Sequence, residues 1–142
     1  MLRILIVAAT VVTMAAAPLA AQEGSGIAYV QAPEMGSGLC LGNSSDAAFK
    51  CARQKCVEGG GTAEACIDVA FCNPARISVD VFVQQKDGPH WHEFVCGLDS
   101  RATAMEVARV ICDRARRTDL QECEITKIYD QNAKEMKFDY GD

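Results

Sequence analysis

The cysteine pattern of this 142-residue chain occurs twice. Cys40 and Cys56 stand 56 positions before Cys96 and Cys112, and Cys66 stands 57 positions before its counterpart, Cys123. Apolar residues between these cysteines repeat at the same offset of 56: Ala48, Phe49 and Ala52 correspond to Ala104, Met105 and Ala108. We therefore predict a tandem duplication, with repeats at about 27–72 and 77–129.

Each half of the chain predicts two strands, a helix and a third strand. Apolar residues at helical spacing predict helices over Ser44–Val57 and Asp99–Arg117, with Asn43–Asp46 supplying acceptors for the first helix start. Ala32–Gly38 is rich in turn-forming residues and predicts a connection. Short or alternating apolar runs predict strands at 27–30, 39–41, 66–72, 77–84, 90–96 and 122–129. The predicted fold is α+β: one mostly antiparallel sheet with two helices on one face and a pseudo-twofold axis.

The first 21 residues have the pattern of a secretory signal peptide. Arg3 precedes an apolar run from Ile4 to Val12, and an alanine-rich stretch ends at Ala21. A retained membrane anchor is the alternative, but the run ends at Pro18 and is weakly apolar for a permanent span. We expect cleavage after Ala21 and a periplasmic or secreted product. Residues 22–131 would form one domain, followed by a polar C-terminal tail at 132–142.

Charge argues against two classes of partner. The full chain has a net charge of −5, and loss of Arg3 with the leader leaves −6. An acidic chain has no electrostatic attraction to nucleic acid or to an anionic membrane surface. We therefore expect neither partner once the leader is removed.

All eight cysteines lie in the part predicted to be exported, and an even number there indicates four disulfides. A chain that reverses after each helix brings Cys56 to Cys66 and Cys112 to Cys123, so we predict these two bridges. The other four cysteines allow three connectivities. Repeat matching favours a bridge between the equivalents Cys40 and Cys96, and it leaves Cys51 to pair with Cys72. No Cys-x-x-Cys occurs, so zinc-ribbon and thioredoxin-like chemistry are not indicated.

His90-Trp91-His92 is the most distinctive local cluster. Two histidines two apart on a strand point to the same face, a spacing that could offer two imidazoles to copper or zinc, with Asp87 or Met35 as a third ligand. The alternative is a strand whose rings cover the sheet. Metal binding is therefore kept as an alternative, and we predict no cofactor.

The hairpin at 86–93 is the predicted contact surface. If Cys96 bridges to Cys40 inside the core, His90 and His92 point inward and Trp91 stands on the open face of the sheet. An exposed tryptophan beside Glu93 and Asp87 is the kind of aromatic anchor that interfaces favour. We therefore name Trp91, Glu93 and Asp87 as candidate interaction residues.

The chain contains none of the common local signatures of catalysis. Arg114, Arg116 and Arg117 could bind an anion, but they are better explained as complements to the negative end of the second helix. A secreted enzyme remains an alternative, and it would need a site assembled from both halves.

Three features together resemble a known family: Ile27-Ala28-Tyr29, a helix ending in Cys56 or Cys112, and a cysteine opening an apolar strand. They resemble the bacterial secreted domain-of-unknown-function 4189 family over about residues 27–72 and, without the opening motif, 77–129. The resemblance implies a small exported α+β module and implies no activity. Our prediction from the sequence is a disulfide-stabilised binding module without catalysis, whose partner is a protein in the envelope or outside the cell.

Overall fold

The computed structural model describes residues 25–86 and 88–139. The predicted leader, 1–21, lies outside these residues. The described residues form an α+β fold of two helices and seven antiparallel strands in two sheets. None of the described helices is long and apolar enough to cross a membrane.

The two halves share one topology, as the duplication predicts. The first half comprises β1 (Gly26–Ala32), β2 (Gly36–Gly42), α1 (Ser45–Glu58) and β3 (Ile67–Cys72). The second comprises β4 (Ile77–Gln85), β5 (His90–Leu98), α2 (Arg101–Ile111) and β6 (Leu120–Tyr129), with the short β7 (Glu135–Met136) added. The strand orders are β2-β1-β3 and β5-β4-β6-β7, so the first strand of each half is central. We refer to these as the N-terminal sheet and the C-terminal sheet.

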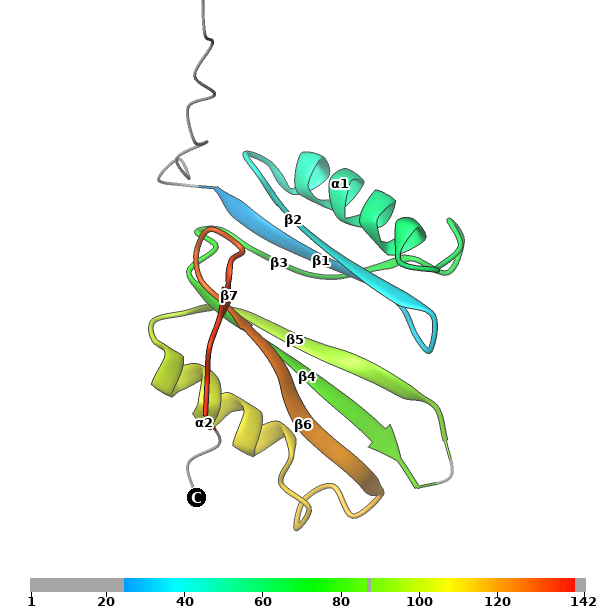
Figure 1. The fold of residues 1–142 in the computed structure, drawn as a ribbon, viewed down its shortest axis with the longest axis vertical. Coiled ribbons are helices and arrows are strands. Elements are labelled where there is room, and N and C mark those ends of the chain that lie inside the picture. Colours follow the sequence, from blue (N-terminus) through cyan, green and yellow to red (C-terminus); the bar gives the residue numbers. More distant parts are fainter. Residues whose placement is uncertain (1–24, 87, 140–142) are drawn as a thin grey trace, which may run out of the picture.

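The single predicted sheet is wrong, because the two halves stack face to face. The layers run α1, N-terminal sheet, C-terminal sheet, α2, so each helix covers the outer face of its own sheet (Figure 1). Every residue of β1 is buried. Ala28 and Val30 face α1, whereas Ile27 and Tyr29 face the other sheet. A strand that is apolar on both sides needs cover on both, which a sheet with helices on only one face cannot supply.

Glycines let α1 lie directly against β2. Gly36, Gly38 and Gly42 alternate along β2 on the side of α1, and a Cβ at Gly38 would lie 2.1 Å from the Ala52 carbonyl oxygen. The helix backbone therefore takes the space that side chains would occupy. The sequence prediction of a turn-rich connection over Ala32–Gly38 is wrong here, because only residues 33–35 connect the strands.

The helix starts follow the prediction better than the ends. Ser44 and Ser100, 56 positions apart, cap α1 and α2 by accepting from the Ala47 and Thr103 amides. The second helix ends at Ile111, six residues before the predicted Arg117. Cys112, the cap residue, is tied to β6, and the Arg117 guanidinium turns back to donate to the Ile111 carbonyl at 3.3 Å.

Two of the four predicted bridges are confirmed. Cys56–Cys66 and Cys112–Cys123 join each helix end to the following strand region, at equivalent places in the two halves. The described residues contain no free cysteine.

The other two predicted bridges, Cys40–Cys96 and Cys51–Cys72, are wrong. Cys40 pairs with Cys51 and ties β2 to α1, whereas Cys72 pairs with Cys96 and joins the two sheets. The cause is one extra residue in β5: Ile77 lies opposite Leu98 and Val79 opposite Val95, and Gly97 has a φ of 77°. This bulge reverses the side on which Cys96 points, so Cys40 faces α1 while Cys96 faces β3.

The predicted polar tail is partly structured. Glu135 and Met136 pair with Tyr129 and Ile128, and Phe138 packs against the α2 core.

Replacing Gly38 by alanine should destabilise the protein by about 2–3 kcal/mol, because the new Cβ meets helix backbone and not a movable side chain. Urea denaturation gives the free energy of unfolding. Gly88→Ala is the control, since a Cβ there meets only the Gln85 side chain and should change stability by about 0.5 kcal/mol or less. Equal effects of the two changes would contradict the close packing of α1 on β2.

Changing Cys72 and Cys96 together to serine should lower the free energy of unfolding by about 3 kcal/mol, because this bridge closes the longest loop, with a separation of 24 residues. Urea denaturation measures this loss. Peptide mapping without reduction checks the connectivity: a fragment that joins Cys72 to Cys51 would contradict the structure.

Candidate functional site: a groove between the two sheets

The two sheets meet along one side and separate along the other. β3 lies against β5, and Cys72–Cys96 joins them covalently. On the opposite side, the backbone of β2 approaches only β1 and α1 among the described elements. A groove of about 200 Å³ opens there, and we call it the inter-sheet groove. Its lining residues come from both halves: Tyr29, Ser37, Gly38, Leu39, Lys55, Asp80, Phe94, Lys127 and Tyr129.

Tyr29 forms the floor of the inter-sheet groove. Its side chain is fully buried, and its hydroxyl shares a hydrogen bond with Ser78 on the facing sheet. Its ring stacks on Phe94 with centroids 4.6 Å apart and lies 6.4 Å from the ring of Tyr129. The floor is therefore a rigid aromatic layer that joins β1 to β4, β5 and β6.

A buried carboxylate and an imidazole lie beside this layer. Asp80 is only 5% exposed, and its carboxylate lies 2.6 Å from Nδ1 of His92, with which it forms a hydrogen bond. The His92 ring also stacks on Phe94 at 5.9 Å. Gln31 holds the His92 backbone from the other sheet, accepting from its amide at 2.9 Å and donating to its carbonyl at 2.7 Å. His92 is thus fixed through its ring and its backbone.

Two lysines flank the inter-sheet groove. Lys55 comes from the last turn of α1, and it reaches the groove because α1 lies so close to Gly38. Lys127 comes from β6, and its ammonium lies 3.7 Å from the exposed Glu135 carboxylate. Lys55 makes no ion pair with any described residue. A protein of net negative charge therefore has two cationic side chains at one groove, one from each half.

Burial raises the pKa of Tyr29 and of Tyr129 well above the ordinary value of 10.0, because the phenolate would lose its hydration. Asp80 adds to both shifts through its negative charge. Both phenols therefore stay protonated near neutral pH and can serve as hydrogen-bond donors.

A second, polar pocket of about 180 Å³ lies between the β1–β2 turn and the start of β5, and both histidines line it. The prediction that His90 and His92 share a face agrees with this position. The described residues hold no group of three or more His, Cys, Asp or Glu side chains able to hold a metal ion. Met35 lines the same pocket, and Asp87 lies outside the described residues. Metal binding by the two histidines stays a prediction.

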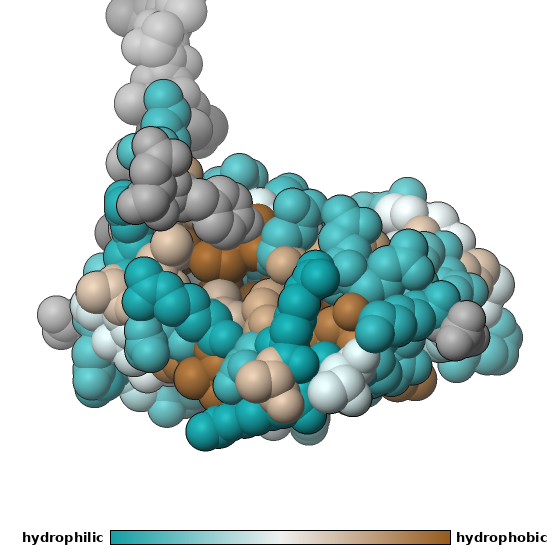
Figure 2. Space-filling model, turned by 90° about the horizontal axis from the view of Figure 1, so that it is seen from below, coloured by the Kyte–Doolittle hydropathy of each residue, from teal (hydrophilic) through white to brown (hydrophobic). Residues whose placement is uncertain are grey.

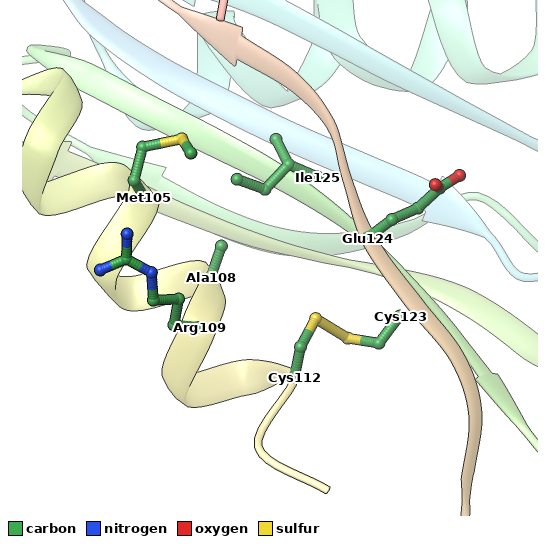
Figure 3. Close-up of a pocket in the computed structure, with 7 residues that line it drawn as sticks. All are labelled: Met105, Ala108, Arg109, Cys112, Cys123, Glu124 and Ile125. Carbon is green, nitrogen blue, oxygen red and sulfur yellow. A yellow bond between two sulfur atoms is a disulfide. The ribbon is translucent and has the colours of Figure 1, made fainter. Parts of the chain in front are cut away.

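A third pocket, of about 170 Å³, lies between α2 and β6 (Figure 3). Met105, Ala108, Ile125 and the Cys112–Cys123 bridge give it an apolar lining, and Arg109 at its edge is already paired with Glu106. In Figure 2 the face below the C-terminal sheet shows apolar surface only as patches between hydrophilic side chains. Nothing in this pocket specifies a ligand.

Two of the predicted interaction residues, Trp91 and Glu93, do not lie on an open face, and the third, Asp87, lies outside the described residues. Trp91 is half-buried on the α2 side of the C-terminal sheet, with the Arg117 guanidinium 5.9 Å from its ring. Its Nε1 donates to Glu93 at 3.3 Å, and Glu93 in turn pairs with Arg117 at 2.8 Å. The premise of an open face is wrong, because the C-terminal sheet is covered by α2 on one side and by the N-terminal sheet on the other. Binding by Trp91 stays a prediction.

Sequence reasoning missed the residues of the inter-sheet groove. One signal was present: Asp80 is a charged residue inside the valine-rich run of β4, and a buried carboxylate needs a partner. The two lysines had no such signal, because they lie 72 positions apart and meet only through the stacking of the sheets.

Comparisons of the chain with protein-family models, with curated proteins and with solved structures find no match. The resemblance to the domain-of-unknown-function 4189 family therefore stays a prediction.

The stability of the protein should fall as the pH rises above about 10, because the tyrosines of the unfolded chain then ionise before the buried ones do. Each buried tyrosine contributes at most about 1.4 kcal/mol per pH unit in this range. Tyr129→Phe should remove part of this dependence, as measured by urea denaturation at pH 9 and pH 11. An unchanged pH dependence in the variant would show that Tyr129 is not protected from ionisation.

Proposed function

We propose that this protein is an exported binding module without catalytic activity, which contacts a protein partner through the inter-sheet groove. The observation that carries this proposal is the pair Lys55 and Lys127 at the groove edge. Because one lysine comes from each half of the chain, this arrangement exists only in the folded protein.

The electrostatics favour an anionic group on the partner. The chain has a net charge of −5, so a partner of uniform negative charge would be repelled over most of the surface. At the groove, Lys55 of one half and Lys127 of the other both line the walls, and the Asp80 carboxylate is hydrogen-bonded to His92. A carboxylate presented by the partner would meet Lys55, which has no ion-pair partner among the described residues, Lys127, which already lies beside Glu135, and the Tyr129 phenol, which stays protonated.

The rigidity of the frame supports binding over catalysis. Four disulfides tie the described residues, and one of them holds the two sheets together on the closed side of the groove. A groove whose walls are fixed before binding loses little conformational entropy when a partner docks. The bridges also fit an oxidising compartment, in agreement with the predicted export.

A secreted enzyme is the second candidate, and one observation favours it. Asp80 orients His92, whose side chain is 30% exposed, at a pocket that Gln31 and Glu34 of the other half also line. A carboxylate that orients an imidazole is the usual arrangement of a general base. Turnover of a substrate that disappears in His92→Gln and persists in His90→Gln would favour this candidate over a binding module.

Reversing both groove charges, Lys55→Glu with Lys127→Glu, should abolish capture of the partner from the organism's own envelope or culture fluid. The control is Lys50→Glu with Lys134→Glu, which makes the same charge change at two exposed lysines, one from each half, outside the groove. Cross-linking followed by mass spectrometry of the captured complex locates the contact. Cross-links that avoid the groove, or equal capture by the two double variants, would show that the partner binds elsewhere.

A further inference from the structure

β2 forms an edge of the N-terminal sheet. Its seven residues pair with β1 in an unbroken antiparallel register from Gly36↔Ala32 to Gly42↔Gly26. In the part of the chain that the structure describes, no strand pairs with its other side. The outward backbone groups of β2 therefore have no strand partner among the described elements.

This edge lacks the usual protection against pairing. Edge strands of soluble proteins commonly carry charges, proline or a bulge, or are covered by another element. β2 reads Gly-Ser-Gly-Leu-Cys-Leu-Gly, which contains no charge and no proline, and its pairing with β1 shows no bulge. By contrast, the edge strand β3 carries Asp68 and lies against β5, and the edge strand β5 carries Glu93 and a bulge.

The surroundings of β2 match an acidic strand. Leu39 and Leu41 lie on the face of β2 that is turned towards the C-terminal sheet, the same side as Tyr29 in the floor of the inter-sheet groove. α1 covers the opposite face of β2. A strand added beside β2 would direct alternate side chains towards α1, where Lys55 lies, and towards β6, where Lys127 lies. Acidic side chains would meet Lys55 on one side and, on the other, Lys127 beside its ion-pair partner Glu135.

We propose that the free edge of β2 binds an extended acidic segment of the partner as a fourth strand of the N-terminal sheet. This inference rests on the proposed function and specifies the partner: main-chain hydrogen bonds to β2 supply affinity, and Lys55 and Lys127 select for carboxylates. A second copy of this chain fits less well, because antiparallel pairing of two β2 strands would bring the lysines of both copies together.

The test uses the exported chain, residues 22–142, and a fluorescein-labelled nine-residue peptide of alternating Glu and Val. Fluorescence anisotropy measures its affinity, and amide hydrogen exchange by NMR measures protection along Ser37–Leu41. We expect saturable binding with slowed exchange in β2, at least tenfold weaker in the Lys55→Glu/Lys127→Glu variant and unchanged in Lys50→Glu/Lys134→Glu.

Two further peptides separate strand addition from charge attraction. A Glu/Val peptide with N-methyl groups on two adjacent central residues cannot pair along either edge, and a Lys/Val peptide carries the wrong charge. Both should bind at least tenfold more weakly than the parent peptide. Equal binding of the N-methylated peptide, no binding of the parent peptide, or a dimer of the free protein formed through β2 would each overturn the proposal.

The same measurements distinguish this inference from the proposed function. If the groove-charge variant loses its partner while the complex leaves β2 unprotected in hydrogen exchange, the groove is the binding site and strand addition is wrong. If the peptide binds β2 but the groove-charge variant still captures the partner, the natural contact lies elsewhere and both proposals fail.

Discussion

The burial of β1 on both faces is the constraint on which the rest of the structure depends. Its alternate residues belong to two different cores, one shared with α1 and one shared with the C-terminal sheet. Once the N-terminal sheet must be covered on both sides, the second half has to stack on it. The four layers in Figure 1, the inter-sheet bridge and the groove all follow from that stacking.

The two halves share a topology but differ in how their helices pack, and this difference creates the site. In the first half, glycines of β2 bring the α1 backbone into contact with the strand, so Lys55 projects at the strand edge. In the second half, β5 carries full side chains and a bulge that turns Cys96 towards β3. One side of the sandwich is therefore closed covalently, and the other side remains open.

The polar groups inside the sandwich explain why the sheets hold a defined relation. The Tyr29–Ser78 hydroxyl pair and the two hydrogen bonds of Gln31 to the His92 backbone join the two sheets, whereas the Asp80–His92 pair links β4 to β5 within the C-terminal sheet. Among the described residues, every buried side-chain nitrogen or oxygen has a hydrogen-bond partner. The pairs that join the two sheets are sensitive to relative displacement of the sheets, because a polar group that loses its partner inside the protein is costly. They therefore specify one arrangement of the two halves and keep the groove open at a fixed place.

Local and repeating patterns in the sequence were sufficient to predict the α+β fold class, the internal repeat and the strand–strand–helix–strand order of each half. They also predicted the two disulfides at the helix ends. Those features depend on residues close together in the chain, such as Ser44 and Ser100 at the helix starts or Cys112 and Cys123 across one loop. The number of sheets, the partner of Cys96 and the groove were decided only by tertiary structure. A single inserted residue at the β5 bulge reverses the direction of a side chain, and repeat matching cannot register it because the bulge leaves the spacing of the cysteines unchanged. Lys55 and Lys127 likewise come to line one groove only when the two sheets stack, since no local pattern in the chain relates them.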